Sequence, residues 1–350
     1  MSTKPKDLDD AVRAGLITSA ADLRARIVPA TPAPKTDTGA VIIDFASALM
    51  SAEELVAKDI PQRPRLLGAW LREGDLGYVF APRGHGKSWL AMLIGNAVAN
   101  GTALGSWEAG EGSRPVFYFD AEMNLPDVQD RARKIGIDSD AFHWLSNEHL
   151  YMEQGISVNI ANPIHQAGLS AMLPDGSLFI IDNLSTGQIG MKENENDDFD
   201  KIKDWLLSLR RRGITVLIVH HAGRNGEMRG GSRREDPAHW IISLRDASEE
   251  GARCKQFITS FSKCRNCQGR DAQPLRWTMQ DDGGRIAITN ETFSGTDALL
   301  AHIRDGVGSA SDLAGLLNTS TPTISKWAKK LITAGLIKKK GRDYEAVETL

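Results

Sequence analysis

The sequence is poor in cysteine and has no apolar run long enough to cross a membrane. Its three cysteines cannot build a disulfide framework, which favours a reducing compartment. The longest apolar runs, such as Leu178–Ile181, have only the length of buried strands. The N-terminal segment Met1–Asp10 is polar and of mixed charge, unlike a secretory signal. We therefore expect a cytoplasmic protein with no membrane partner.

A large excess of one charge sign is also absent. The net charge of −3 gives no global attraction to nucleic acid, so any surface that binds DNA must be a local basic region. With 350 residues, the chain has room for one large domain and one smaller domain.

The sequence divides into three regions. Residues 1–50 are expected to form a flexible N-terminal region that includes the Pro/Thr/Ala-rich linker Pro29–Gly39. In residues 51–293, apolar strands alternate with amphipathic helices, which predicts an α/β fold with a mainly parallel sheet. Expected strands are 77–80, 116–119, 178–181 and 214–219, and expected helices are 87–98, 128–134 and 199–211. After residue 240 strand follows strand, at 241–244, 256–261, 275–279 and 285–288, which predicts an antiparallel extension of the sheet.

Residues 81–88 read Ala-Pro-Arg-Gly-His-Gly-Lys-Ser between an expected strand and an expected helix. This is the phosphate-binding pattern G-x-x-x-x-G-K-[ST], with Ala81 in place of the first glycine. The two glycines allow backbone N–H groups to face phosphates, Lys87 supplies a positive charge, and Ser88 offers a hydroxyl to Mg²⁺. The predicted nucleotide-binding residues are Arg83, Gly84, His85, Gly86, Lys87, Ser88 and Trp89.

Polar residues follow three of the expected strands. Asp182 ends the strand 178–181, where it would hold Mg²⁺ together with Ser88 or else cap a turn. Glu122 follows the strand 116–119 and would deprotonate the attacking water, a role that Asp120 could also fill. His221 ends the strand 214–219 and is either a γ-phosphate sensor or a structural histidine.

The order of these segments resembles RepA-like hexameric replicative helicases, within the RecA-type P-loop ATPase superfamily. The resemblance covers roughly residues 60–290. It is carried by the segments 81–88, 119–123, 180–185, 220–221 and 228–232. It implies a ring, commonly of six subunits, with ATP and Mg²⁺ bound between neighbouring subunits.

The segment 261–266, Phe-Ser-Lys-Cys-Arg-Asn, resembles the Lys-x-Arg element of DnaB-type and KaiC-type rings. The resemblance implies that Lys263 and Arg265 contact the γ-phosphate on the adjacent subunit, with Arg229 as the rival residue. The alternative is a pair of solvated bases on an edge strand. Cys264 and Cys267 also form a C-x-x-C, whose spacing we interpret as coincidence, because Cys254 alone cannot complete a four-sulfur zinc site.

Two basic regions are candidates for DNA binding. The loop 224–234, with Arg224, Arg233 and Arg234, lies where RecA-type rings place pore loops for single-stranded DNA. Residues 294–350 predict three helices and a basic hairpin, and this pattern resembles a winged helix with Pro322–Ala334 as recognition helix and Thr321 as its N-cap. Its predicted DNA contacts are Thr323, Lys326, Lys330, Lys338 and Lys339. A winged helix that binds protein is the alternative.

Together these features predict an ATP-dependent DNA helicase or translocase that forms a ring. The resemblance implies a role in replicating a plasmid, phage or other mobile element, with replication proteins as further partners. Two alternatives stay open. One is a DNA-binding ATPase that loads or regulates other proteins without unwinding DNA. The other is a regulator whose ATP site only switches assembly.

Overall fold

The computed structural model describes residues 44–187, 196–223, 228, 234–248, 254–317 and 319–347. The chain divides into two compact units, residues 1–62 and 63–350. In the first unit, helix α3 (Ala52–Ala57) begins with a capping box, in which the Ser51 hydroxyl and the Glu54 carboxylate each accept a backbone N–H. Among the described helices, none is long and apolar enough to pass through a bilayer.

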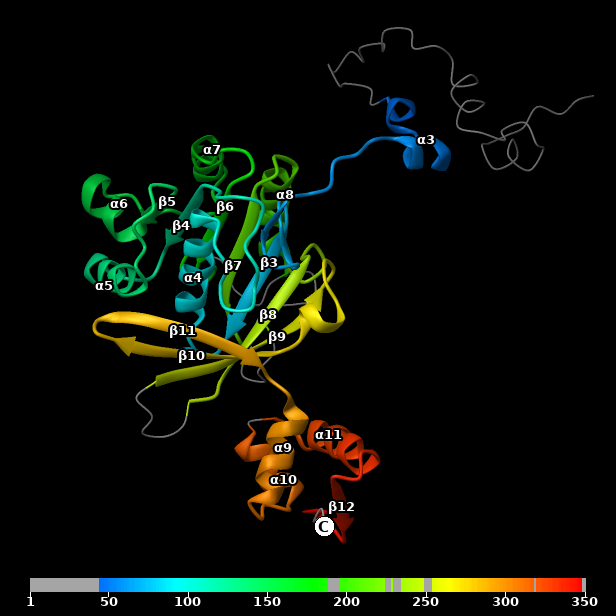
Figure 1. Ribbon diagram of the computed structural model, residues 1–350. Coiled ribbons are helices and arrows are strands. Elements are labelled where there is room, and N and C mark those ends of the chain that lie inside the picture. Colours follow the sequence, from blue (N-terminus) through cyan, green and yellow to red (C-terminus); the bar gives the residue numbers. More distant parts are fainter. Residues whose placement is uncertain are drawn as a thin grey trace, which may run out of the picture. The chain divides into compact units, whose positions relative to one another are not determined.

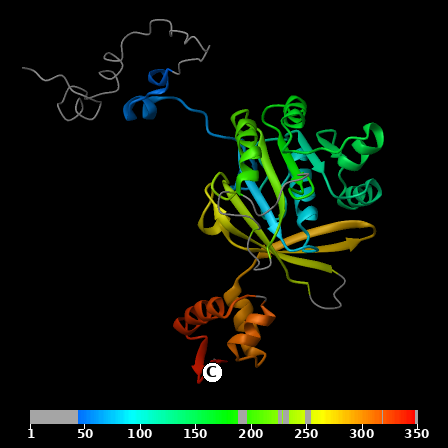
Figure 2. The same cartoon turned by 180° about the vertical axis from the view of Figure 1, so that it is seen from behind.

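The second unit is built around a large mixed sheet (Figures 1 and 2). Its strands in the described residues are β3 (Leu76–Ala81), β4 (Val116–Asp120), β5 (Phe142–Ser146), β6 (Leu178–Asp182), β7 (Thr215–His221), β8 (Trp240–Asp246), β9 (Cys254–Cys264), β10 (Leu275–Asp282) and β11 (Arg285–Thr292). Their order is β11-β10-β9-β8-β3-β7-β6-β4-β5. The pairs from β8 to β5 are parallel, and the pairs among β8, β9, β10 and β11 are antiparallel. The predicted α/β class, with its antiparallel extension, is confirmed.

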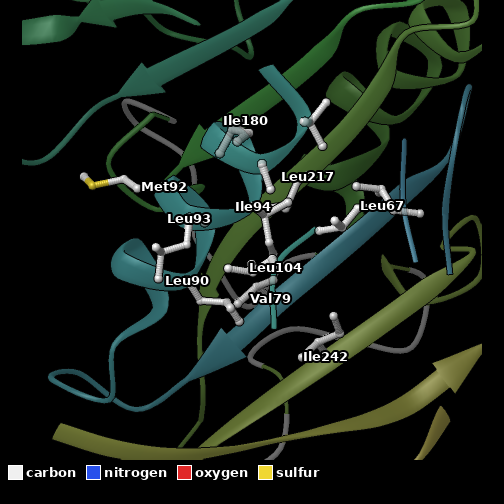
Figure 3. Close-up of a cluster of buried hydrophobic side chains, with 14 of the residues drawn as sticks. Leu67, Val79, Leu90, Met92, Leu93, Ile94, Leu104, Ile180, Leu217 and Ile242 are labelled. Carbon is white, nitrogen blue, oxygen red and sulfur yellow. The ribbon is translucent and has the colours of Figure 1, made fainter. Parts of the chain in front are cut away.

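Both faces of the parallel strands are buried, which explains why these strands read as continuous apolar runs. On one face, alternate residues such as Val79, Ile180 and Leu217 pack against helix α4 (Lys87–Asn100), as Figure 3 shows. The intervening residues of the same strands form a second cluster with helices α7 (Pro163–Met172) and α8 (Asn196–Arg211). The central strands are thereby fixed between two layers of helices.

Several short or edge elements were not expected from the sequence. They are the strands β1 (Arg65–Leu67) and β2 (Leu71–Arg72), the edge strand β5, and the helices α6 (Asn147–Gln154) and α7. Strand β5 is only partly buried, so its residues Phe-His-Trp-Leu-Ser carry no clear apolar run. Helix α5 (Leu125–Ile135) begins three residues before its expected start, after the N-cap Asn124.

The C-terminal residues form three helices and a hairpin around their own core. The elements are α9 (Gly295–Arg304), α10 (Ala310–Leu316), α11 (Thr321–Thr333), β12 (Ile337–Lys340) and β13 (Asp343–Ala346). Ile324, Ala328 and Leu331 of α11 are buried in this core, as the helical spacing predicts. The predicted N-cap Thr321 is wrong: Ser320 precedes the first turn, and its hydroxyl accepts the N–H of Thr323 at 3.4 Å.

Candidate nucleotide-binding site

The P-loop connects β3 to α4. Gly84 and Gly86 have φ values of 79° and 93°, which side chains rarely tolerate, and Gly86 caps α4 without a side chain. The first N–H groups of α4 are therefore left for an anion, as at other phosphate-binding helix N-termini. Ala81 is the last residue of β3 and lies in the core beneath α4, so the first position of the motif requires no glycine here.

The loop opens into a cavity of about 530 Å³ at the carboxyl edge of the sheet, where the parallel strands end. The cavity brings together most of the predicted site: Arg83, Gly84, Gly86, Lys87, Ser88, Trp89, Glu122, Asp182 and His221. These residues are far apart in sequence but meet because β3, β4, β6 and β7 all end at this edge. Of the predicted nucleotide-binding residues, only His85 does not line the cavity.

Lys87 is fixed within the loop rather than extended into solvent. Its Nζ donates to the carbonyl oxygens of Ala81 at 3.0 Å and of Pro82 at 2.8 Å. Burial lowers the pKa of Lys87, whereas the carboxylates of Asp182 and Glu122 oppose this shift. The neighbouring carboxylates thus favour a charged ammonium group at the phosphate end of the cavity.

Asp182 and Ser88 lie together at the end of β6 and the start of α4. The Asp182 carboxylate is 4% exposed and accepts hydrogen bonds from the Tyr118 hydroxyl at 2.5 Å and from Ser88. Burial raises the pKa of Asp182, and the two hydroxyl groups partly offset that effect.

The donor set of this pair fits Mg²⁺. The cation prefers a few oxygen ligands from protein and takes the rest from phosphates and water. No cluster of three or more histidine, cysteine or acidic residues suited to a metal occurs in the described part of the chain. Ser88 and Asp182 would hold the ion, which when bound neutralises charge on the phosphates.

Glu122 and Asp120 have different roles in the structure. Glu122 lines the cavity, and its carboxylate accepts a hydrogen bond from the Asn183 amide. Asp120 is 1% exposed, and its Oδ1 accepts the backbone N–H groups of Glu122 at 3.0 Å and Met123 at 2.9 Å. Asp120 therefore shapes the loop that presents Glu122, and the geometry favours Glu122 as the base.

Asp120→Asn is expected to stabilise the protein at high pH. Burial raises the pKa of Asp120 from 3.8 to about 6, so the folded state retains a proton that the unfolded state releases in this interval. The carboxyl group thus destabilises the fold increasingly as pH rises through the interval, and fully above it. Asparagine keeps the Oδ1 acceptor without the charge, so a gain of about 1–3 kcal/mol in unfolding free energy is expected at pH 8, and little at pH 4. Denaturant unfolding at both pH values measures the difference, and a gain independent of pH would contradict it.

The end of β7 places its two histidines differently. His221 lines the cavity, whereas His220 is fully buried, with its Nε2 3.0 Å from Nη1 of Arg234. Arg234 is 2% exposed, and its guanidinium also lies 5.7 Å from the centre of the Phe199 ring. The prediction that Arg234 contacts DNA is therefore wrong, because a side chain buried in this way cannot reach a phosphate backbone. Arg224, Arg229 and Arg233 lie outside the described residues.

The antiparallel extension adds cavity residues that the sequence reading missed. Lys255 at the start of β9 donates to the carbonyl of Gly84 at 2.9 Å and pairs with Asp246 at 3.0 Å, which braces the P-loop. The hairpin β10–β11 contributes Met279, Asp281 and Ile286 to the wall. No linear motif marks these residues, because only the order of strands brings them to the P-loop.

Lys263 and Arg265 lie at the opposite end of the strands from the cavity, where the parallel strands begin. The register pairs Cys264 with Trp240, where β8 begins, so the end of β9 is remote from the P-loop. Lys263 Nζ donates to the carbonyl of Glu235, and Arg265 Nη2 donates to that of Asp236 at 3.0 Å. Neither residue lines the cavity of its own chain, so neither can contact a nucleotide bound there.

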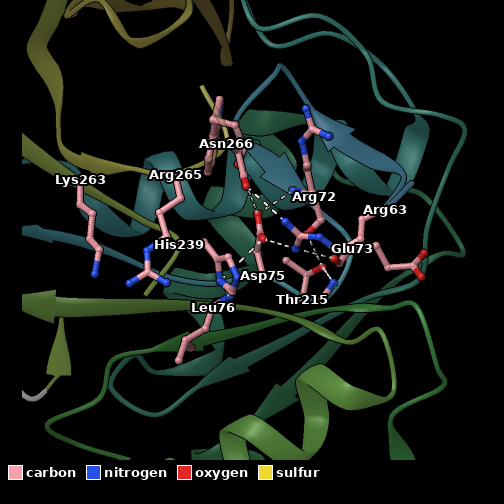
Figure 4. A network of polar contacts seen from close by, with 12 residues as sticks. Arg63, Arg72, Glu73, Asp75, Leu76, Thr215, His239, Lys263, Arg265 and Asn266 are labelled. Atoms are coloured by element: carbon pink, nitrogen blue, oxygen red, sulfur yellow. Dashed lines mark hydrogen bonds and ion pairs between the residues drawn. The ribbon is translucent and has the colours of Figure 1, made fainter. Parts of the chain in front are cut away.

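A buried polar network fixes the turn that carries Arg265. Asp75 is fully buried and accepts hydrogen bonds from the side chains of Arg63 and Asn266, both at 2.6 Å (Figure 4). Asn266 also donates to the carbonyl of Trp70 at 2.7 Å. The backbone N–H of Arg265 donates to the carbonyl of His239 at 2.8 Å. Main-chain and side-chain bonds thus hold Arg265 at a defined place.

The parallel sheet, the P-loop and the paired Ser88 and Asp182 define a P-loop ATPase. The model of the AAA_25 family, an AAA domain, matches residues 44–227, and the chain belongs to this family.

Two solved structures are similar over 62% of this chain. The flagellar accessory protein FlaH of Methanocaldococcus jannaschii matches with a TM-score of 0.41 and 9% identity, over 89% of its own length. A KaiC-like protein of Pyrococcus horikoshii matches with a TM-score of 0.44 and 14% identity, over 90% of its length.

Proposed function

We propose that this protein is an ATP-driven DNA helicase or translocase that works as a ring. The observation that carries the proposal is the separation of Lys263 and Arg265 from the P-loop of their own chain. Two cations held at a fixed place, yet away from their own nucleotide, are suited to complete the site of a neighbouring subunit. There they would offset charge that develops on the transferred phosphoryl group.

Within one subunit, the residues that line the cavity would have separate roles in binding and hydrolysing ATP. Lys87 and the N–H groups of the loop bind the phosphates, and Ser88 and Asp182 hold Mg²⁺. Glu122 accepts the proton of the attacking water, and the amide of Asn183 orients its carboxylate. His221, at the end of β7, is placed to respond to the γ-phosphate.

Exposed lysines on the C-terminal helices and hairpin support DNA as the partner. Lys326 and Lys330 of α11 and Lys339 of β12 are exposed, and no carboxylate of the described residues forms an ion pair with them. Lys338 is also exposed, although it lies 3.7 Å from Glu345. This arrangement supports the interpretation as a winged helix, with Thr323 at the start of the recognition helix.

Lys326→Glu and Lys330→Glu are each expected to weaken DNA binding roughly tenfold at low salt, and to reduce the salt slope by about one. The reason is the loss of a phosphate contact and its counterion release. Arg304→Glu, the same charge reversal at an exposed position of α9, is the control and should bind as the unchanged protein does. Fluorescence anisotropy over a salt series measures both quantities. Equal losses in all three variants would point to a non-specific charge effect.

The helicase activity is tested by comparing ATP hydrolysis with strand displacement on forked DNA. We expect single-stranded DNA to stimulate hydrolysis and the protein to displace strands, with both activities lost in Lys87→Ala. Stimulated hydrolysis without displacement on any fork would favour the alternative of an ATPase that loads or regulates other replication proteins. Full biological activity of Lys87→Ala would favour a regulator that uses ATP only to assemble.

A further inference from the structure

The turn after β9 brings two thiols together next to Arg265. The Sγ atoms of Cys264 and Cys267 are 2.7 Å apart, and either sulfur can donate a hydrogen bond to the other. Both side chains are half-buried against the core cluster beneath α4. The anchored Asn266 lies between them, so the turn that aligns the two thiols is the one held by the Asp75 network.

The hydrogen bonds at the two sulfur atoms are not equivalent. The backbone N–H of Cys267 donates to the Sγ of Cys264 at 3.2 Å, so the Cys264 sulfur accepts a hydrogen bond from the turn. The Sγ of Cys267 instead donates toward the carbonyl of Asp271 at 3.6 Å, which favours the protonated thiol. Burial also raises the pKa of Cys267. In a thiol–disulfide exchange this asymmetry would favour Cys264 as the attacking sulfur and Cys267 as the resolving one.

The spacing of this C-x-x-C alone suggested a coincidence, but the contact between the two sulfur atoms leads us to another interpretation. We propose that Cys264 and Cys267 form a redox-active dithiol that exchanges with low-molecular-weight disulfides such as oxidised glutathione. The Cys264 thiolate attacks the disulfide, forms a mixed disulfide and releases one glutathione thiol. The Cys267 sulfur, after losing its proton, then displaces the second glutathione and closes an intramolecular disulfide. The protein loses two electrons and two hydrogens, and one oxidised glutathione is reduced to two thiols.

The third cysteine provides an internal comparison. Cys254 begins β9 and Cys264 ends it, so an extended strand of roughly 30 Å separates them. Cys254 cannot reach the pair within one chain. The same strand thus carries one isolated thiol, Cys254, and one thiol with a partner, Cys264. Only Cys264 can form a disulfide within the chain.

The experiment exposes the reduced full-length protein to oxidised glutathione and measures its intact mass. We expect a loss of two hydrogens from the pair, with Cys264 and Cys267 protected from a later alkylating reagent. In Cys254→Ser, Cys264 and Cys267 should lose two hydrogens and be protected from alkylation in the same way. Stable glutathione adducts on Cys264 and Cys267 without ring closure would overturn the proposal. So would no reaction at the pair under conditions that modify Cys254.

Single variants test the order of attack. Cys267→Ser should trap one glutathione on Cys264, because the resolving sulfur is missing. Cys264→Ser should react at Cys267 at least tenfold more slowly, since that thiol is held protonated. Equal rates in the two variants would contradict the assignment of Cys264 as the attacking sulfur. These readouts do not depend on ATP or DNA. The dithiol proposal can therefore fail while the proposed function stands, and the proposed function can fail while the dithiol proposal stands.

Discussion

Replacing Arg265 by alanine is expected to lower ATP turnover by about 10³-fold or more, while ATP affinity changes less than about threefold. Arg265 is remote from the cavity of its own chain, so its removal leaves the binding residues in place. Its guanidinium would act only on the nucleotide of the neighbouring subunit. Steady-state turnover and binding of a fluorescent ATP analogue separate the two effects. If binding and hydrolysis fell together, the assignment of Arg265 as a catalytic residue in trans would be wrong.

A matched control is available in the connection between β9 and β10. Arg270→Ala removes an exposed guanidinium a few residues later, outside the anchored turn, and should leave turnover unchanged. Lys263→Ala should give a smaller loss than Arg265→Ala, because a lysine offers a point charge rather than a planar fork of donors. Equal losses for Arg265 and Arg270 would indicate a general effect of surface charge.

Glu122→Gln is expected to lower turnover by about 10²–10⁴-fold and to retain ATP. Glutamine has the same shape and can still accept the hydrogen bond from Asn183, but it cannot take a proton from water. Single-turnover hydrolysis measures the loss, and Asp120→Asn is the matched control because its amide still accepts the loop N–H groups. Normal turnover in Glu122→Gln with a large loss in Asp120→Asn would make Asp120 the base.

Mixing the two inactive variants tests both assignments at once. In a mixed ring, an Arg265→Ala subunit keeps an intact Glu122, and a neighbouring Glu122→Gln subunit supplies an intact Arg265. Some interfaces would then be complete, so mixing should restore a part of the activity that neither variant has alone. Residues that act on the nucleotide of their own chain could not complement one another in this way.

The sequence predicts the parts of this protein that local pattern determines. The P-loop follows from its spacing, and the central strands follow from apolar runs that are buried on both faces. Glu122 and Asp182 could be found because parallel strands end at one edge of the sheet. Polar residues at or just after the ends of these strands are therefore expected to lie together at the ligand-binding edge.

The parts that the sequence did not predict depend on contacts between distant segments. Lys255 and Asp281 reach the cavity only because β9 and β10 turn back beside β8. Arg234 sits in a glycine-rich, basic stretch that suggests solvent exposure, yet Phe199 and His220 bury it. The N-cap of α11 was misplaced by one residue, because Ser320 and Thr321 are both good caps and only geometry decides between them.

Strand β9 links two tasks that the proposed ring would assign to different subunits. Lys255 near its start contacts the P-loop carbonyl of Gly84, and its far end carries Lys263, with Arg265 directly after the strand. The strand is paired with β8 on one side and β10 on the other, with one shift of register against β8 just before Lys263. In the proposed ring, the phosphates bound by one subunit and the cations offered to its neighbour would lie at the two ends of this one strand. A single strand of eleven residues would thereby connect the nucleotide site of one subunit to the site that it completes in the next.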